Sequence, residues 1–212
     1  MGEAKRRHNR RDFSHCAYCG QPATSRDHVP PKCIFPSGRE NLITVPACSL
    51  HNMHRSKLDE LLLQFLGLHA EQVQPYNARL WDDALKSLKR SKRDRLIKER
   101  LVFDARTGLS ATLVEAKPFI ASVKTIVQGL YWHHQDEQLG LDTPISASMW
   151  RPDAELTLLS YMKSFSVAQG QFAYAFGVVD GDPKASVWYM QFQRNVLVCA
   201  YTGSAADAQD HS

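Results

Sequence analysis

The 212-residue sequence predicts an α+β fold, with a small metal-stabilised N-terminal core followed by helices and a C-terminal α+β region containing an antiparallel sheet. Three observations predict this class. Two pairs of soft metal ligands, Cys16-x-x-Cys19 and Cys48-x-x-His51, enclose a segment interrupted by Pro and Gly. Apolar residues recur at helical intervals in the middle of the chain. Near the C-terminus they alternate with the period of strands.

Composition places the chain among globular proteins of a reducing compartment. Hydrophobic residues make up 43% and charged residues 23% of the sequence. No apolar run is long enough for a membrane span, and the N-terminal residues MGEAKRRHNRRD lack the apolar segment of a secretory signal. We therefore expect a cytoplasmic protein without a membrane partner, in which five cysteines favour metal binding over disulfides.

Charge is unevenly distributed along the chain. Residues 1–100 contain 19 Lys and Arg against 11 Asp and Glu, whereas residues 101–212 contain 7 against 11. A basic first half is expected for a module that binds a polyanion. A solvated surface would have the same composition, so charge alone does not select between the two interpretations.

The ligand pairs predict one zinc site. They are separated by 28 residues, and each x-x spacing turns both side chains to one side of a tight knuckle. Short apolar patches within 14–47 predict strands and turns, and a helical pattern from about Ser49 ends before Gly67. A knuckle, a hairpin and a helix around one zinc form a treble-clef arrangement. Such a small segment needs the metal for much of its folding energy.

The remaining chain predicts further elements. Helices are expected over 76–101 and 118–134, two short strands within 101–115, and a meander over 172–179, 186–192 and 196–201. Alternating aromatic residues in the meander are read as core, with a base-stacking platform as the alternative, and His133-His134 as surface or packing residues. The predicted organisation is a basic arm (1–13), the zinc-stabilised core (14–68), a basic helical region (69–100), an α+β domain (101–202) and a disordered tail (203–212).

Polar residues between the zinc ligands indicate chemistry. Hydrolysis of a phosphodiester requires a base for water, a cation near the phosphate and a group that orients the base. His28 can accept a proton near neutral pH, and Asp27 and Asn52 offer oxygen ligands suited to Mg²⁺. Asn41 can support the loop or the imidazole through its amide.

In this order the residues resemble the HNH nuclease family, which has a ββα-metal core. The resemblance is carried by Asp27-His28-Val29-Pro30-Pro31, Asn41-Leu42, Cys48-Ser49-Leu50-His51-Asn52 and Lys57, and covers about 45 of the 212 residues. It implies that His28 is the general base, that Asp27 and Asn52 hold a catalytic Mg²⁺ or Mn²⁺, that Asn41 is structural, and that Cys16, Cys19, Cys48 and His51 hold a separate zinc. His51 stands where a fourth cysteine is usual, and His54 is a rival ligand.

The resulting prediction is a metal-dependent endonuclease acting on DNA. Basic residues expected to contact nucleic acid are Lys5, Arg6, Arg7, Lys32, Arg55, Lys57, Lys89, Arg90, Lys92 and Arg93. A solvated helix face is the alternative for the run from Lys86 to Arg100. Other functions consistent with the sequence are a non-catalytic zinc-stabilised nucleic-acid-binding module, and a nuclease effector of a defence or toxin system regulated by its C-terminal domain. A homodimer or a regulatory protein partner is also compatible.

Overall fold

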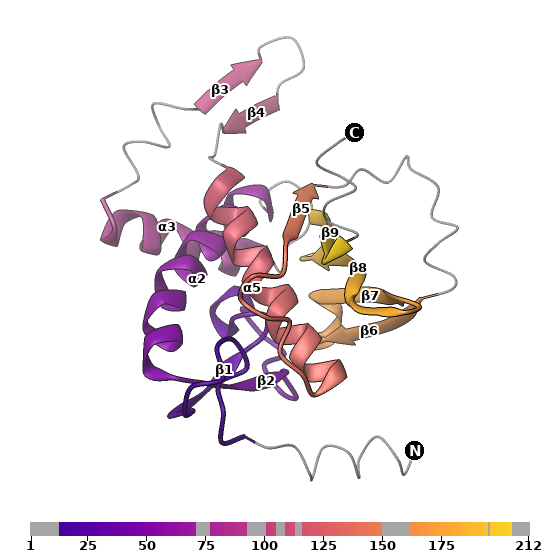
Figure 1. Cartoon of the computed structure of the whole chain (residues 1–212). Helices are drawn as coiled ribbons and strands as arrows, with labels where there is room; N and C mark the ends of the chain where they lie inside the picture. Colours follow the sequence, from indigo (N-terminus) through magenta and orange to yellow (C-terminus); the bar gives the residue numbers. More distant parts are fainter. Residues whose placement is uncertain are drawn as a thin grey trace.

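The computed structural model describes residues 13–70, 77–92, 101–104, 109–112, 116–149, 162–194 and 196–204. The predicted basic arm and the predicted disordered tail lie almost entirely outside these residues, as does the second half of the basic run, 93–100. Within the described ranges the chain forms the mixed α and β architecture that the sequence predicts (Figure 1).

A short hairpin opens the described chain. β1 (Ser25–His28) and β2 (Thr44–Ala47) pair antiparallel, with His28 opposite Thr44. The connecting loop contains a single 3-10 turn, η1 (Lys32–Ile34). Proline lacks a backbone N–H, so Pro30 and Pro31 in this loop limit the length of regular pairing. The short strands and turns predicted for this segment are confirmed.

Helix α2 (Ser49–Ala70) follows β2 directly, which completes a ββα unit. The prediction that the helix ends before Gly67 is wrong. A Cβ on Gly67 would lie 2.3 Å from the Cβ of Ala84 on α3 (Asn77–Arg90), so the glycine permits a close approach of two helices. Of the helix predicted over 76–101, the structure describes α3 alone, and a strand has begun by residue 101.

Two strands predicted within 101–115 are present. β3 (Leu101–Asp104) and β4 (Leu109–Thr112) pair antiparallel, with Leu101 opposite Thr112. The residues that connect them, 105–108, lie outside the described ranges.

Helix α5 (Ala116–Gln135) lies between the ββα unit and the C-terminal sheet (Figure 1). Against α2, the rings of Phe119 and Phe65 stack at 4.1 Å between centroids. Toward the sheet, the hydroxyl of Tyr131 donates to the carbonyl oxygen of Pro183 at 2.8 Å. The helix predicted over 118–134 is therefore confirmed, and it contributes to the packing of both halves of the chain.

The C-terminal sheet is antiparallel, with strand order β5-β9-β8-β7-β6. Its strands are β5 (Ile145–Met149), β6 (Lys163–Val167), β7 (Phe172–Val179), β8 (Asp182–Phe192) and β9 (Val196–Thr202), with a short turn η3 (Ala168–Gly170) before β7. The predicted meander forms the centre of this sheet. Strands β5 and β6 add an edge on each side, and neither was predicted from the sequence.

The alternating aromatic residues of β7 face the interior. Phe172, Tyr174 and Phe176 are all buried, which confirms the interpretation of these alternating residues as core. The Nε2 atom of His134 lies 2.9 Å from the hydroxyl of Tyr174, and its ring packs 4.4 Å from that of Phe176. His134 is thus a packing residue, as predicted.

A single hydrophobic cluster joins the two halves. It includes Tyr18 between Cys16 and Cys19, Ile34 of η1, Leu130 of α5 and Trp188 of the sheet. The segments predicted as a zinc-stabilised core and as a C-terminal domain therefore share one interior. Among the described helices, none has both the length and the apolarity needed to cross a bilayer.

Candidate metal centre

The four predicted ligands come together at the start of α2. Cys16 and Cys19 lie on a tight turn in which the N–H of Gly20 donates to the carbonyl oxygen of Cys16 at 2.9 Å, with Gly20 at φ +73°. This left-handed conformation favours glycine. The N–H of Ala17 donates to the carbonyl oxygen of Pro46 at 2.9 Å, which attaches the turn to β2.

Distances within the cluster match a tetrahedral ion. The Nδ1 of His51 lies 3.3 Å from the sulfur of Cys48 and 3.8 Å from that of Cys16, and the sulfurs of Cys19 and Cys48 are 3.9 Å apart. All ligand atoms lie within 4.8 Å of one another. Zinc bonds of about 2.3 Å to sulfur and about 2.0 Å to nitrogen give tetrahedral edges of roughly 3.5–3.8 Å. The cluster therefore fits a structural zinc bound through His51 Nδ1.

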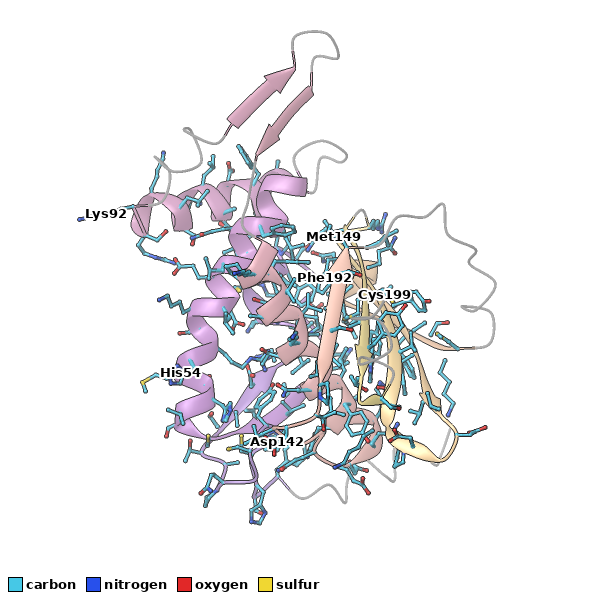
Figure 2. The ribbon with its side chains drawn as sticks, turned by 45° about the horizontal axis from the view of Figure 1, so that its top comes forward. His54, Lys92, Asp142, Met149, Phe192 and Cys199 are labelled. Carbon is cyan, nitrogen blue, oxygen red and sulfur yellow. The ribbon has the colours of Figure 1, made fainter. Side chains whose placement is uncertain are left out.

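His54, the rival ligand considered from the sequence, is not part of this group. It is exposed, and Figure 2 shows its side chain on the outer side of α2. The described residues that gather as metal ligands are Cys16, Cys19, Cys48 and His51.

Protonation of the thiols is adjusted by their surroundings. Burial raises the pKa of Cys16 and raises that of Cys19 to about 11. In contrast, hydrogen bonds from the backbone N–H and the ring of His51 lower the pKa of Cys48 to about 6. Zinc binds thiolates, so a bound cation would offset the burial penalty that keeps the first two thiols protonated.

The C-terminal half supports the zinc turn from outside. The side-chain amide of Gln138, just beyond α5, donates to the carbonyl oxygen of Cys16 at 2.8 Å. The same amide packs 3.2 Å from the position of a Cβ on Gly20. Tyr18 stacks on the ring of His51 at 5.4 Å between centroids. These contacts orient the ligands, as outer hydrogen bonds commonly do at metal sites.

Asp27 is buried between β1 and α2. Its residue exposure is 7%, and its Oδ2 accepts a hydrogen bond of 2.9 Å from the hydroxyl of Tyr18. The same oxygen forms an ion pair with Nη1 of Arg55. Burial raises the pKa of Asp27 to about 7, and the backbone hydrogen bond at His28 and the charge of His51 act in the opposite direction. The neighbouring guanidinium also favours the ionised carboxylate. The carboxylate is thus held by two protein donors.

The burial of Arg55 contradicts the prediction that it contacts nucleic acid. It is 3% exposed, its guanidinium lies 4.9 Å from the centre of the Tyr18 ring, and burial lowers its pKa to about 10. Its Nε has no hydrogen-bond partner among the described residues. A side chain enclosed in this way cannot reach a phosphate outside the protein.

His28, the predicted base, is the last residue of β1 and is half-buried. Burial, and then the positive charge of Lys32, lower its pKa, so the imidazole is neutral at physiological pH. Within the described part of the chain, no hydrogen bond or ion pair joins this ring to Asp27 or Asn52. Neither ring nitrogen of His28 is therefore engaged in a hydrogen bond with Asp27 or Asn52.

Asn52 and Asn41 occupy different surroundings. Asn52 is exposed in the first turn of α2, and its Nδ2 donates to Ser25 Oγ of β1 at 3.2 Å. This contact places Asn52 beside the strand that carries Asp27. Asn41 is exposed in the hairpin loop at φ 58°, a left-handed conformation that asparagine tolerates better than most residues. The feature of Asn41 that the structure describes is therefore its backbone conformation.

The other basic residues predicted to contact nucleic acid are either exposed or outside the described residues. Lys32, Lys57, Lys89, Arg90 and Lys92 are exposed, and Figure 2 shows Lys92 pointing outward at the end of α3. Arg90 also forms an ion pair of 3.0 Å with Glu60. Lys5, Arg6, Arg7 and Arg93 lie outside the described residues.

Sequence reasoning missed Tyr18, Ser25 and Gln138 as parts of the site. The sequence did contain a signal that Arg55 lies beside the site. It follows Asn52 by three residues on a helix, so the two side chains lie on the same face. Nothing local indicates Gln138, whose contact with Cys16 depends on the path of the chain after α5.

Comparisons with protein-family models, with curated proteins and with solved structures found no match. Any function proposed for the chain therefore rests on the chemistry of its own residues.

Proposed function

We propose that the protein is an endonuclease of the HNH type, which hydrolyses phosphodiester bonds of DNA with His28 as general base. The observation that supports this best is the position of His28: a half-buried imidazole at the end of β1, on the hairpin attached to the Cys₃His cluster, where burial and the charge of Lys32 lower its pKa. A base must be unprotonated to accept a proton from water, and this environment favours that form.

The chain's own residues suit the other steps. Lys32 is exposed and close enough to His28 to lower its pKa, so its ammonium can offset negative charge on a phosphate bound beside the imidazole. Lys57 and the exposed basic residues of α3 are suited to contacts with the phosphate backbone that position the strand. The zinc cluster fixes the hairpin against α2 and takes no part in the reaction.

A catalytic Mg²⁺ or Mn²⁺ belongs to this proposal. The donor types suit such an ion, because Asp27 offers a carboxylate on β1, and Asn52 at the start of α2 is attached to the same strand by its hydrogen bond to Ser25. When bound, such an ion supplies positive charge to the phosphate and the leaving oxygen. In this structure the carboxylate of Asp27 is neutralised by Arg55, so the ion would have to replace that guanidinium.

A second candidate is a zinc-stabilised nucleic-acid-binding module without catalysis. It is favoured by the contacts of Asp27, because the ion pair with Arg55 gives this carboxylate a structural role that requires no reaction. The exposed basic residues of α3 would serve binding equally well. A third candidate, a nuclease regulated by its C-terminal domain, rests on the charge asymmetry of the sequence alone.

A plasmid-nicking assay separates the first two candidates. Zinc-loaded protein is incubated with supercoiled DNA and Mg²⁺ or Mn²⁺, alongside single-stranded DNA and RNA. His28→Ala should reduce cleavage by at least about 100-fold, the contribution expected of a general base, while zinc content and DNA binding are retained.

His54→Ala is the matched control, because His54 is an exposed histidine of α2 that is absent from the ligand group. It should cut like the unmodified protein. Protein that shifts DNA on a gel but never cuts any of the substrates would support the binding module instead.

A further inference from the structure

Arg55 and a divalent cation held by Asp27 would both contact the same carboxylate oxygen, Oδ2 of Asp27. Nη1 of Arg55 contacts both Oδ2 of Asp27 and the hydroxyl of Tyr18, and Tyr18 donates to that same oxygen. Asn52, one helical turn before Arg55, reaches β1 through Ser25. The carboxylate proposed to hold the cation is therefore already neutralised by a guanidinium.

We propose that Arg55 competes with the divalent cation for Asp27, and thereby sets how tightly the cation is held; this inference rests on the proposed nuclease function. A carboxylate that neutralises one buried cation offers less attraction to a second. Removing its partner would also leave the guanidinium buried without compensation, which is strongly unfavourable. Occupation of Asp27 by the ion is therefore coupled to displacement of Arg55.

The surroundings of Arg55 are consistent with such a displacement. Its Nε lacks a hydrogen-bond partner among the described residues, so Asp27 does not satisfy the whole guanidinium. Asp59 lies one turn further along α2 and is close enough to interact electrostatically with Arg55. A guanidinium released from Asp27 would thus remain near a second carboxylate.

The test measures Mn²⁺ binding to the zinc-loaded full chain by calorimetry, with no nucleic acid present. Arg55→Met removes the competing charge and keeps an unbranched side chain. It should bind Mn²⁺ at least about tenfold more tightly than the unmodified protein, because a competing charge is lost from a buried site. Adding Asp27→Asn to this variant should abolish the gain. Equal or weaker binding by Arg55→Met would overturn the competition, as would an absence of Mn²⁺ binding in every form.

Two further variants keep the test decisive. Tyr18→Phe removes a neutral donor from the same oxygen and should leave Mn²⁺ affinity within a few-fold, and a gain as large as that of Arg55→Met would show that charge is not the cause. If Arg55→Met does not fold, as judged by zinc content and thermal unfolding, Arg55→Lys replaces it. The shorter lysine should weaken the ion pair and raise Mn²⁺ affinity, and an unchanged affinity would refute the proposal.

This outcome is independent of the nuclease assay. If Mn²⁺ affinity responds as expected but no form cuts nucleic acid, the competition stands and the proposed function fails. If the protein cuts but its Mn²⁺ affinity is indifferent to Arg55, the proposed function stands and the competition fails.

Discussion

Gly129→Ala tests whether α5 is pressed against the hairpin that carries His28. A Cβ at this position would lie 2.6 Å from Cγ2 of Val29 and 3.1 Å from the hydroxyl of Tyr18. In an open helix the change would stabilise the protein by about 0.8–1.0 kcal/mol. Overpacking of a filled interior costs about 1–3 kcal/mol. The cost of the close contact should exceed the gain in helix propensity. The free energy of unfolding should therefore fall by about 1 kcal/mol, which lowers Tm by roughly 2–4 °C for a chain of this size.

The measurement is thermal unfolding of the zinc-loaded protein followed by circular dichroism. Lys124→Ala, on the exposed side of the same helix, is the control and should change Tm little. A Val29→Ala background removes the closest contact and leaves that with Tyr18, so Gly129→Ala should there destabilise the protein less. A higher Tm for Gly129→Ala alone would mean that α5 does not approach Val29, and the shared core described above would be refuted.

Two further predictions concern the metal centre and the base. Cys16→Ala should abolish stoichiometric zinc binding and lower thermal stability sharply, because structural zinc can supply on the order of 10 kcal/mol to a small site; zinc analysis and calorimetry check this, and a variant that keeps both would exclude the cluster as a zinc site. Because the pKa of His28 lies below its usual value of 6.5, nicking should be constant across neutral pH and decrease only as His28 becomes protonated below that value. A rate that instead rises on acidification would exclude His28 as the base.

Elements that depend on short-range spacing could be predicted from the order of the residues, without the fold. Two residues between Cys16 and Cys19, and between Cys48 and His51, suffice to place each pair on one side of a turn, so the ligand set could be identified without a fold. The amphipathic period of α5 and the strand period of β7 are equally local. Such patterns can be recognised in the sequence because residues close together along the chain produce them.

The partners of the site residues, in contrast, depend on contacts between segments far apart along the chain. The Asp27-to-Arg55 ion pair joins residues 28 apart, and the Gln138-to-Cys16 hydrogen bond joins residues 122 apart. Side-chain identity alone could not distinguish a buried Arg55 from an exposed one, nor a helix end at Gly67 from a close crossing with Ala84. Burial and hydrogen bonding of this kind arise from the shared core, and a core is a property of the packed chain rather than of any one segment.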